Sequence, residues 1–176
     1  MPRNVEIKAR LTHVEEQRSR AAQLADAPPE VIKQEDVFFN VPQGRLKLRF
    51  LSPTHGQLIF YQRSDQIGPK LSMYERVDTD QPHQLKAVLE AGYGIRSIVR
   101  KTRHLYKVGR TRIHLDDVET LGDFLELEVV LSDSEAPSVG EHEARQLMQK
   151  LGITETQLVK EAYVDLLQQH NEAGDK

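Results

Sequence analysis

Two segments of the sequence, far apart along the chain, place polar or ionisable side chains at every second position. Near the N-terminus apolar residues alternate with Asn4, Glu6 and Lys8, and much later they alternate with Glu126 and Glu128. Successive side chains of an extended strand point to opposite faces, so each segment predicts a strand with one apolar and one polar face. Such a polar face either contacts water or forms the wall of a charged cavity.

Three further segments show the same alternation with basic side chains, which favours the cavity. The shared faces of these three predicted strands carry Arg45, Lys47 and Arg49; Lys70, Ser72, Tyr74 and Arg76; and Lys101 and Arg103. If all these strands closed into one sheet with their ionic faces inward, the interior would be a basic channel with a cluster of carboxylates at one place. A polyphosphate and its divalent metal ion require this chemistry, because cations neutralise phosphate oxygens and carboxylates hold the metal.

The composition limits the class of protein. The chain has 176 residues, which suits one domain. Its 24 Lys and Arg against 27 Asp and Glu give a net charge of -3, so there is no overall basic field to attract nucleic acid. It contains no cysteine, no apolar stretch typical of a signal peptide and no apolar run of membrane-spanning length. We therefore expect a soluble, cytoplasmic protein without nucleic-acid or membrane partners.

Hydrophobic periodicity and turn residues predict mostly strands, with a few helices. After the N-terminal strand, further strands are expected at 31–41, 44–51, 57–63, 70–79, 95–108, 110–118 and 124–131. Helices are expected at 12–25, 82–91, 138–152 and 156–169, the first and third opening with the capping boxes Thr12–Glu15 and Ser138–Glu141. Residues 1–170 are expected to form one domain and residues 171–176 a frayed tail.

An ordered series of motifs along most of the chain resembles the CYTH superfamily, also called triphosphate tunnel metalloenzymes. The family begins with E-x-E-x-K, which Glu6 and Lys8 match in its second half, whereas Asn4 stands in place of the first Glu. The remaining motifs follow in the family's order: Gln34-x-Asp36-x-Phe38-Phe39, Gly44-Arg45-Leu46-Lys47-Leu48-Arg49, Leu58-Ile59-x-Tyr61-x-Arg63, Lys101-x-Arg103, Leu115-Asp116-x-Val118-x-x-Leu121-Gly122-x-Phe124-x-Glu126-x-Glu128 and Tyr163-Val164-Asp165-Leu166-Leu167. The series is most similar to the class IV adenylyl cyclase branch.

The resemblance implies an α+β fold: an eight-stranded antiparallel β-barrel, the triphosphate tunnel, with flanking helices. It also implies Mg²⁺ or Mn²⁺ held mainly by Glu6 and Glu128, with Glu126 and Asp116 as ligands directly or through water. Phosphate oxygens would be bound by Lys8, Lys47, Arg49, Arg63, Arg76, Lys101 and Arg103. Of these residues, Lys8, Lys101, Arg103 and Asp116 are expected to act in catalysis. Because family members often form dimers, a homodimer is compatible with the sequence, although no apolar stripe identifies an interface.

Several residues have a simpler interpretation. Without the family series, Glu6 and Lys8 would be read as a solvated strand face. Asp117 and Glu119 are expected at the surface, and Tyr163 is expected to pack the last helix on the barrel. The histidines show no metal-ligand spacing, so a histidine zinc site is not expected. Strand cations that suit either water or the cavity are Arg10, Arg45, Lys70 and Arg112.

The sequence favours a metal-dependent enzyme that hydrolyses an organic or inorganic triphosphate such as ATP, thiamine triphosphate or tripolyphosphate. A class IV-like adenylyl cyclase, which converts ATP to cyclic AMP and pyrophosphate, is the first alternative. The second is a non-catalytic module that binds triphosphate or polyphosphate, because Asn4 brings no negative charge to a position where the family has a metal-binding Glu.

Overall fold

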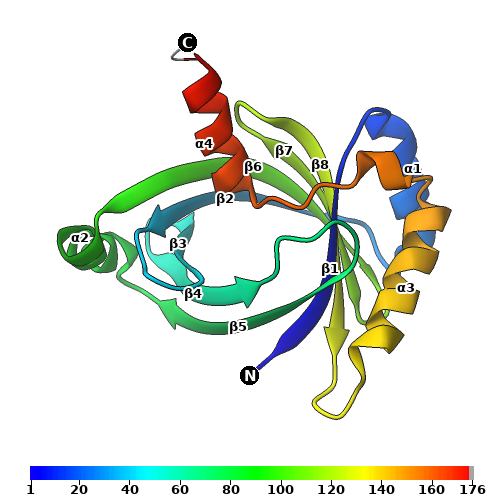
Figure 1. Ribbon diagram of the computed structural model, residues 1–176, viewed down its shortest axis with the longest axis horizontal. Coiled ribbons are helices and arrows are strands. Elements are labelled where there is room, and N and C mark those ends of the chain that lie inside the picture. The colour runs from blue at the N-terminus through cyan, green and yellow to red at the C-terminus, as the bar shows by residue number, and fades with distance from the viewer. Residues whose placement is uncertain (175–176) are drawn as a thin grey trace.

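Eight antiparallel strands of the computed structural model, which describes residues 1–174, close into a barrel (Figure 1). Around the barrel the strands follow the order β1-β5-β4-β3-β2-β6-β7-β8. This confirms the predicted eight-stranded barrel. The strands are β1 (Arg3–Arg10), β2 (Glu30–Phe39), β3 (Arg45–Ser52), β4 (His55–Arg63), β5 (Lys70–Thr79), β6 (Ile95–Val108), β7 (Thr111–Val118) and β8 (Gly122–Leu131).

Four α-helices and one short 3₁₀-helix lie outside the barrel and cover apolar side chains that the strands turn outward. Helices α1 (Val14–Leu24) and α3 (Pro137–Lys150) share a core with Val5, Ile7, Leu127 and Val129 of β1 and β8. Helix α2 (Pro82–Tyr93) packs on β2 and β3, and α4 (Tyr163–Gly174) packs on β6. The 3₁₀-helix is Glu155–Gln157. Much of the apolar core therefore lies outside the barrel, and the interior holds most of the inward polar side chains together with a few apolar ones such as Phe38, Ile59 and Val99.

The alternation of the strands decides which side chains enter the barrel. In β1 the outward residues Val5, Ile7 and Ala9 are at most 1% exposed and belong to the core shared with α1 and α3. Asn4, Glu6 and Lys8 consequently point inward. When the sheet closes, the ionic side chains of the alternating pattern therefore line a cavity, and the apolar side chains lie on the outer surface of the barrel.

Residues 158–162, here called the covering segment, lie across the barrel end formed by the C-terminal end of β1 (Figure 1). A bridge joins Leu158 to Ala9, and the backbone amide of Val159 donates to the carbonyl of Lys8 at 2.9 Å. The ammonium of Lys70 donates at 2.7 Å to the carbonyl of Lys160. Ala162 and the first residues of α4 complete an apolar layer at this end, so the cavity opens at the opposite end.

The helix termini differ from those predicted. Helix α1 begins after His13 and α3 after Ala136, and within the described chain neither has the predicted capping box. The box occurs instead at the 3₁₀-helix, between Thr154 and Gln157. The predicted helix 156–169 is wrong in its first half. Residues 156 and 157 belong to the 3₁₀-helix, residues 158–162 form the covering segment, and α4 begins at Tyr163. Residues 171–174 belong to α4 rather than to a frayed tail, whereas residues 175 and 176 lie outside the described residues.

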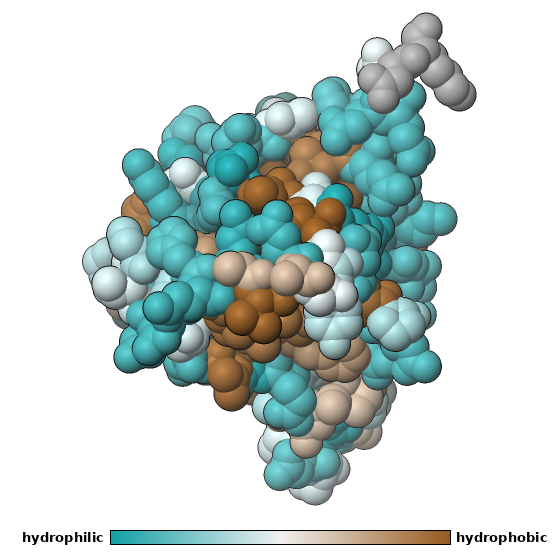
Figure 2. All heavy atoms as spheres, turned by 90° about the vertical axis from the view of Figure 1, so that its left-hand side faces the viewer, coloured by the Kyte–Doolittle hydropathy of each residue, from teal (hydrophilic) through white to brown (hydrophobic). Residues whose placement is uncertain are grey.

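Apolar side chains also lie at the surface. Figure 2 shows the face that carries α2, where apolar groups are interspersed among polar ones. Val88 and Tyr93 of α2 are 69% and 51% exposed, and Val77 of β5 is 61% exposed.

These exposed side chains do not test whether the protein forms a homodimer, so the homodimer stays a prediction. Among the described residues, none of the helices is both long and apolar enough to cross a membrane.

Gly140 tests the packing of α3 on the barrel, with Gly92 of α2 as its matched control. A methyl group at Gly140 would lie 2.8 Å from Leu131 Cδ2 and 2.9 Å from Val5 Cγ2, whereas one at Gly92 would meet no heavy atom within 4 Å. We expect Gly140→Ala to lower the free energy of unfolding by about 1–2 kcal/mol, because the clash exceeds the gain in helix propensity. Gly92→Ala should raise it by about 0.5–1 kcal/mol. Urea denaturation measures both, and stabilisation by Gly140→Ala would contradict the close contact.

Candidate functional site

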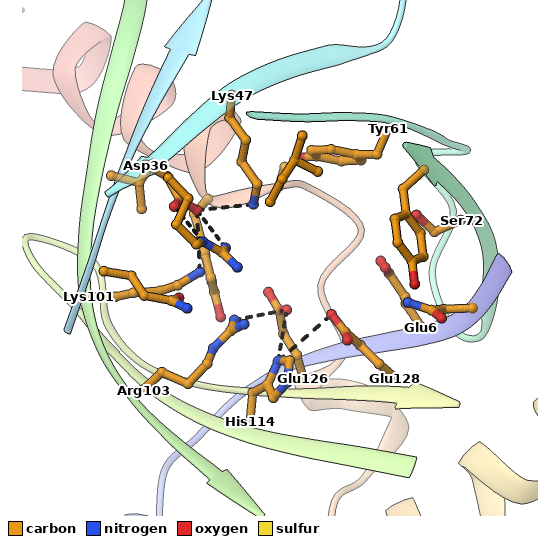
Figure 3. Close-up of a pocket in the computed structure, with 18 of the residues that line it drawn as sticks. Glu6, Asp36, Lys47, Tyr61, Ser72, Lys101, Arg103, His114, Glu126 and Glu128 are labelled. Carbon is orange, nitrogen blue, oxygen red and sulfur yellow. Dashed lines mark hydrogen bonds and ion pairs between the residues drawn. The ribbon is translucent and has the colours of Figure 1, made fainter. Parts of the chain in front are cut away.

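A cavity of about 220 Å³ occupies the interior of the barrel, and all eight strands contribute side chains to it (Figure 3). Its mouth lies at the end where β2 starts and β6 ends, since Ile32, Tyr74, Leu105 and Arg112 there are half-buried and Arg76 is exposed. The opposite end is lined by Ala162 and Tyr163, where the covering segment meets α4. A ligand therefore enters from one side.

The cavity brings together the whole set of cations that the sequence suggested for phosphate binding. Lys8, Lys101 and Arg103 are buried, at 4%, 7% and 5% exposed, whereas Lys47, Arg49 and Arg63 are half-buried. Arg76 differs from the rest because it lies at the mouth. The members of the set are Lys8, Lys47, Arg49, Arg63, Arg76, Lys101 and Arg103.

The predicted metal-binding acids are divided between the cavity and the wall behind it. Glu6, Glu126 and Glu128 line the cavity and gather on one side of it, facing Lys47 and Lys101 across the space (Figure 3). Asp116 is 1% exposed and is not among the lining residues.

The carboxylate of Asp116 is fully engaged by its neighbours. It accepts two hydrogen bonds of 2.7 Å from Arg103 and one of 2.8 Å from the Tyr163 hydroxyl. Burial would raise the pKa of Asp116, but Arg103 and Lys101 lower it to about 2. In this geometry Asp116 positions Arg103, and its role as a metal ligand, directly or through water, and in catalysis stays a prediction.

Each acid of the cavity is paired with a cation. Glu126 lies 3.2 Å from the ammonium of Lys8 and 3.4 Å from Arg103. Glu6 accepts a hydrogen bond of 3.0 Å from Arg63, and Glu128 accepts one of 2.9 Å from Arg112. Paired charges can remain ionised in a buried site. When a charged ligand enters, these carboxylates and cations can therefore leave one another and bind the ligand instead.

Two of these acids differ in how readily they ionise. Burial would raise the pKa of Glu126, but Lys8 and Arg103 hold it well below its usual range. Burial and repulsion by Glu128 raise the pKa of Glu6, and Arg63 offsets only part of this increase.

Two lysines of the cavity have lowered pKa values. Because burial favours the uncharged amine, the pKa of Lys8 falls to about 8 and that of Lys101 to about 7. The cavity is therefore poised to change its protonation near neutral pH.

Asp36 is a site residue to which the sequence analysis gave no role. It is 1% exposed and accepts two hydrogen bonds of 2.8 Å from Arg49 and one of 3.0 Å from Lys47. Burial opposes its ionisation, yet Arg49 and Lys47 hold its pKa well below the usual value. The available signal was its alternation with Gln34 and Phe38, which places it on the inward face. Asp36 fixes two cations of the cavity in position.

Tyr163 packs α4 on the barrel, as predicted, and it also lines the cavity. Its ring faces the ammonium of Lys8, 3.8 Å from the ring centroid, and that of Lys101, 5.0 Å away. Cation–π contacts favour the charged amine. Tyr163 thus holds two cations in place while its hydroxyl binds Asp116.

His114 is a further site residue that spacing along the sequence did not reveal. It is 4% exposed, and one of its ring nitrogens lies within 4.8 Å of a carboxylate oxygen from both Glu126 and Glu128. Burial and Arg103 lower the pKa of its imidazole. Its neighbours Glu126 and Glu128 belong to the adjacent strand β8, so no short sequence motif could have identified His114 as a site residue.

The undecided cations and the surface acids also have clear positions. Arg112 lines the cavity beside Glu128. Lys70 binds the covering segment, Arg45 binds an aspartate of α4 at 2.7 Å, and Arg10 lies over an aromatic ring. Asp117 and Glu119 are exposed, as predicted.

A family model described as the CYTH domain matches residues 2–163, which is nearly all of the chain. The chain belongs to the CYTH family. This CYTH protein is 27% identical to adenylate cyclase CyaB of Aeromonas hydrophila over 94% of its own length and 88% of the relative.

Solved structures share the fold of this CYTH protein at lower identity. A protein of Pyrococcus horikoshii OT3 is 22% identical and superimposes with a TM-score of 0.78 over 93% of this chain and 98% of that one. A protein of Hippeastrum, described as revealing a dominant triphosphatase activity, is 16% identical with a TM-score of 0.64 over 90% and 91% of the two chains. At these identities the likeness shows the fold alone.

Asp116 and Glu128 should differ in their effect on stability. Asp116→Ala removes the partner of the buried Arg103 and should lower the free energy of unfolding by about 3–5 kcal/mol. Glu128→Ala releases Arg112, whose side chain is 33% exposed, and should cost less than about 1 kcal/mol. Denaturant unfolding of the two CYTH variants tests this difference, and equal losses would contradict the division between wall and cavity.

Proposed function

We propose that this CYTH protein is a metal-dependent hydrolase that cleaves the terminal phosphate from a triphosphate carrying an organic group. The observation that carries the proposal is that one cavity holds both a group of three carboxylates, Glu6, Glu126 and Glu128, and a larger set of cations. Lys47 and Lys101 lie across the space from the carboxylates, whereas Lys8, Arg63 and Arg103 are paired with them. A polyanion with a bound divalent cation matches this arrangement, because each of its parts meets the opposite charge.

The acids suit a metal ion in both number and chemistry. Carboxylate oxygens are the ligands that Mg²⁺ and Mn²⁺ favour, and Glu6, Glu126 and Glu128 supply three carboxylates to one cavity. A divalent ion held by Glu6, Glu126 and Glu128 would activate the attacking oxygen and neutralise charge on the phosphate. Asn4, which is 3% exposed and lines the cavity, offers only a neutral oxygen.

The protein's own cations would perform the remaining work. Lys8, Lys101 and Arg103 lie toward the covered end, where they would bind the terminal phosphate and stabilise the charge that develops on its oxygens. Attack of water on the terminal phosphorus breaks the bond to the bridging oxygen and yields orthophosphate and a diphosphate. Buried partners such as Asp116 and Asp36 hold the guanidinium groups in place beforehand, so little reorganisation is needed.

The mouth supports an organic substrate. Ile32, Leu105 and Tyr74 present apolar and aromatic surface there, beside the exposed guanidinium of Arg76. A bare inorganic triphosphate has no group that would contact this surface, whereas the nucleoside or thiamine group of an organic triphosphate would contact it.

The absence of cysteine is compatible with action in the cytoplasm.

A second candidate is an adenylyl cyclase, which the similarity to adenylate cyclase CyaB of Aeromonas hydrophila favours. The same cavity would serve both reactions. In the cyclase the ribose 3′-hydroxyl attacks the first phosphate and pyrophosphate leaves, whereas in the hydrolase water attacks the terminal phosphate.

Product analysis distinguishes the two reactions. We expect the purified protein with Mg²⁺ or Mn²⁺ to release orthophosphate from ATP or thiamine triphosphate faster than from tripolyphosphate. Cyclic AMP with pyrophosphate would instead establish the cyclase. Glu128→Ala should abolish turnover, because it removes a metal ligand without unfolding the barrel. If all three substrates survive while tripolyphosphate still raises the melting temperature, the protein is a binding module and the proposed hydrolase is wrong.

The lowered pKa of Lys101, about 7, predicts how triphosphate binding depends on pH. A bound anion favours the charged amine, so affinity for tripolyphosphate without metal should be highest below pH 7 and fall as Lys101 loses its proton. The loss should reach about tenfold by about pH 9. Lys101→Arg remains charged and should remove the part of this dependence that lies near pH 7, leaving the part near pH 8 that comes from Lys8. Calorimetric titration measures it, with the exposed Lys33→Arg of β2 as control, and parallel curves for all three proteins would contradict the assignment.

A further inference from the structure

The imidazole of His114 lies beside the acids of the cavity in a position that their ion pairs do not explain. Nδ1 of His114 is 3.9 Å from Glu126 Oε2 and also 3.9 Å from Glu128 Oε1. These distances are too long for hydrogen bonds. Figure 3 shows the ring on the same side of the cavity as the two carboxylates and directed toward them.

The same nitrogen lacks a partner within residues 1–174. Nδ1 of His114 is buried, the residue is only 4% exposed, and no hydrogen bond satisfies this atom. A buried polar atom without a partner is uncommon in a folded protein and calls for a physical explanation. Glu128 shows a matching feature, since its Oε2 binds Arg112 while its Oε1 faces His114.

A cation between the three side chains would account for both observations. One ligand atom from each of His114, Glu126 and Glu128 lies within 4.8 Å of the others, which is the separation expected of atoms that share one ion. The three residues come from neighbouring strands, because His114 of β7 pairs with Glu126 of β8 and Glu128 follows two residues later. The barrel therefore holds them at fixed spacing.

We propose that His114 is a nitrogen ligand of the metal ion, and that the site consequently prefers a divalent transition ion such as Mn²⁺ to Mg²⁺. This deepens the metal dependence of the proposed function by naming the class of ion. Mg²⁺ favours oxygen ligands and keeps several waters, whereas divalent transition ions add affinity for imidazole nitrogen, which is weakest for Mn²⁺ and increases along the first row. For Nδ1 to bind the ion, the ring proton must lie on Nε2.

Another role for His114 would be to accept a proton from the attacking water. In that case the ring would contact the water and not the metal ion, and its removal would leave metal binding nearly unchanged. Direct detection of a bond between metal and nitrogen separates the two roles, and it requires neither substrate nor turnover.

The experiment uses the whole protein with less than one equivalent of Mn²⁺ and no triphosphate. Pulsed electron paramagnetic resonance should detect coupling between Mn²⁺ and a ¹⁴N nucleus in the wild-type protein. His114→Gln keeps a polar side chain of similar length and should remove the coupling. It should also weaken Mn²⁺ binding, measured by calorimetry, by about tenfold or more, while Mg²⁺ binding changes by less than about threefold.

The control is His104→Gln on the adjacent strand β6. His104 alternates with the cavity residues Arg103 and Leu105 and therefore points out of the barrel, so this variant should retain both the coupling and the affinity. Absence of nitrogen coupling in wild-type protein with bound Mn²⁺, or no Mn²⁺ binding at all, would overturn the proposal, as would equal losses for Mn²⁺ and Mg²⁺ in His114→Gln. Even if His114→Gln fails to fold, the spectrum of the wild-type protein shows whether nitrogen is bound to Mn²⁺. A nitrogen-bound Mn²⁺ in a protein without turnover would reject the hydrolase and leave the metal site intact.

Discussion

Compensation of buried charge is the constraint on which this barrel depends. Its interior holds ionised groups that would be strongly destabilising if any remained unpaired away from water. The carboxylates therefore act as structural partners of the cations before any ligand arrives. Asp36 and Asp116 illustrate this most directly, since each is 1% exposed and each binds a guanidinium through both oxygens.

The interior acids consequently divide into two groups with different duties. Asp36 and Asp116 are committed to Arg49 and Arg103 and hold these cations at fixed positions. Glu6, Glu126 and Glu128 contact the open space and bind partners that a metal ion and a polyanion could replace. The first group makes the cavity rigid, and the second makes it responsive to ligands. Carboxylates serve both purposes because Asp36 and Asp116 are more deeply buried than Glu6, Glu126 and Glu128.

Period-two alternation of charge predicted the individual strands, because it is a local property that each strand carries by itself. The closed eight-stranded barrel was predicted by the resemblance to the CYTH superfamily. The alternation also predicted the inward cations, since Lys47, Arg49, Lys101 and Arg103 follow from it. The sequence could not predict His114 as a neighbour of the acids or Tyr163 as a neighbour of Lys8, because these contacts depend on the register between strands and on the path of the covering segment. The predicted capping boxes at Thr12 and Ser138 were wrong. Within residues 1–174, helix α1 begins after His13 without a side-chain cap, and α3 begins at Pro137, a residue suited to the first helical position.

The position of β1 has a consequence for how the protein is made. This strand precedes all the others along the barrel, yet its partners are β5 and β8, and the register joins Arg3 to Leu131. Its backbone then receives the covering segment, at Lys8 and Ala9. The barrel cannot close until most of the chain has been synthesised, and contacts so distant in sequence slow folding. During that interval the charged face of β1 keeps the waiting strand hydrated, so the same side chains that later line the cavity protect the nascent chain from premature association.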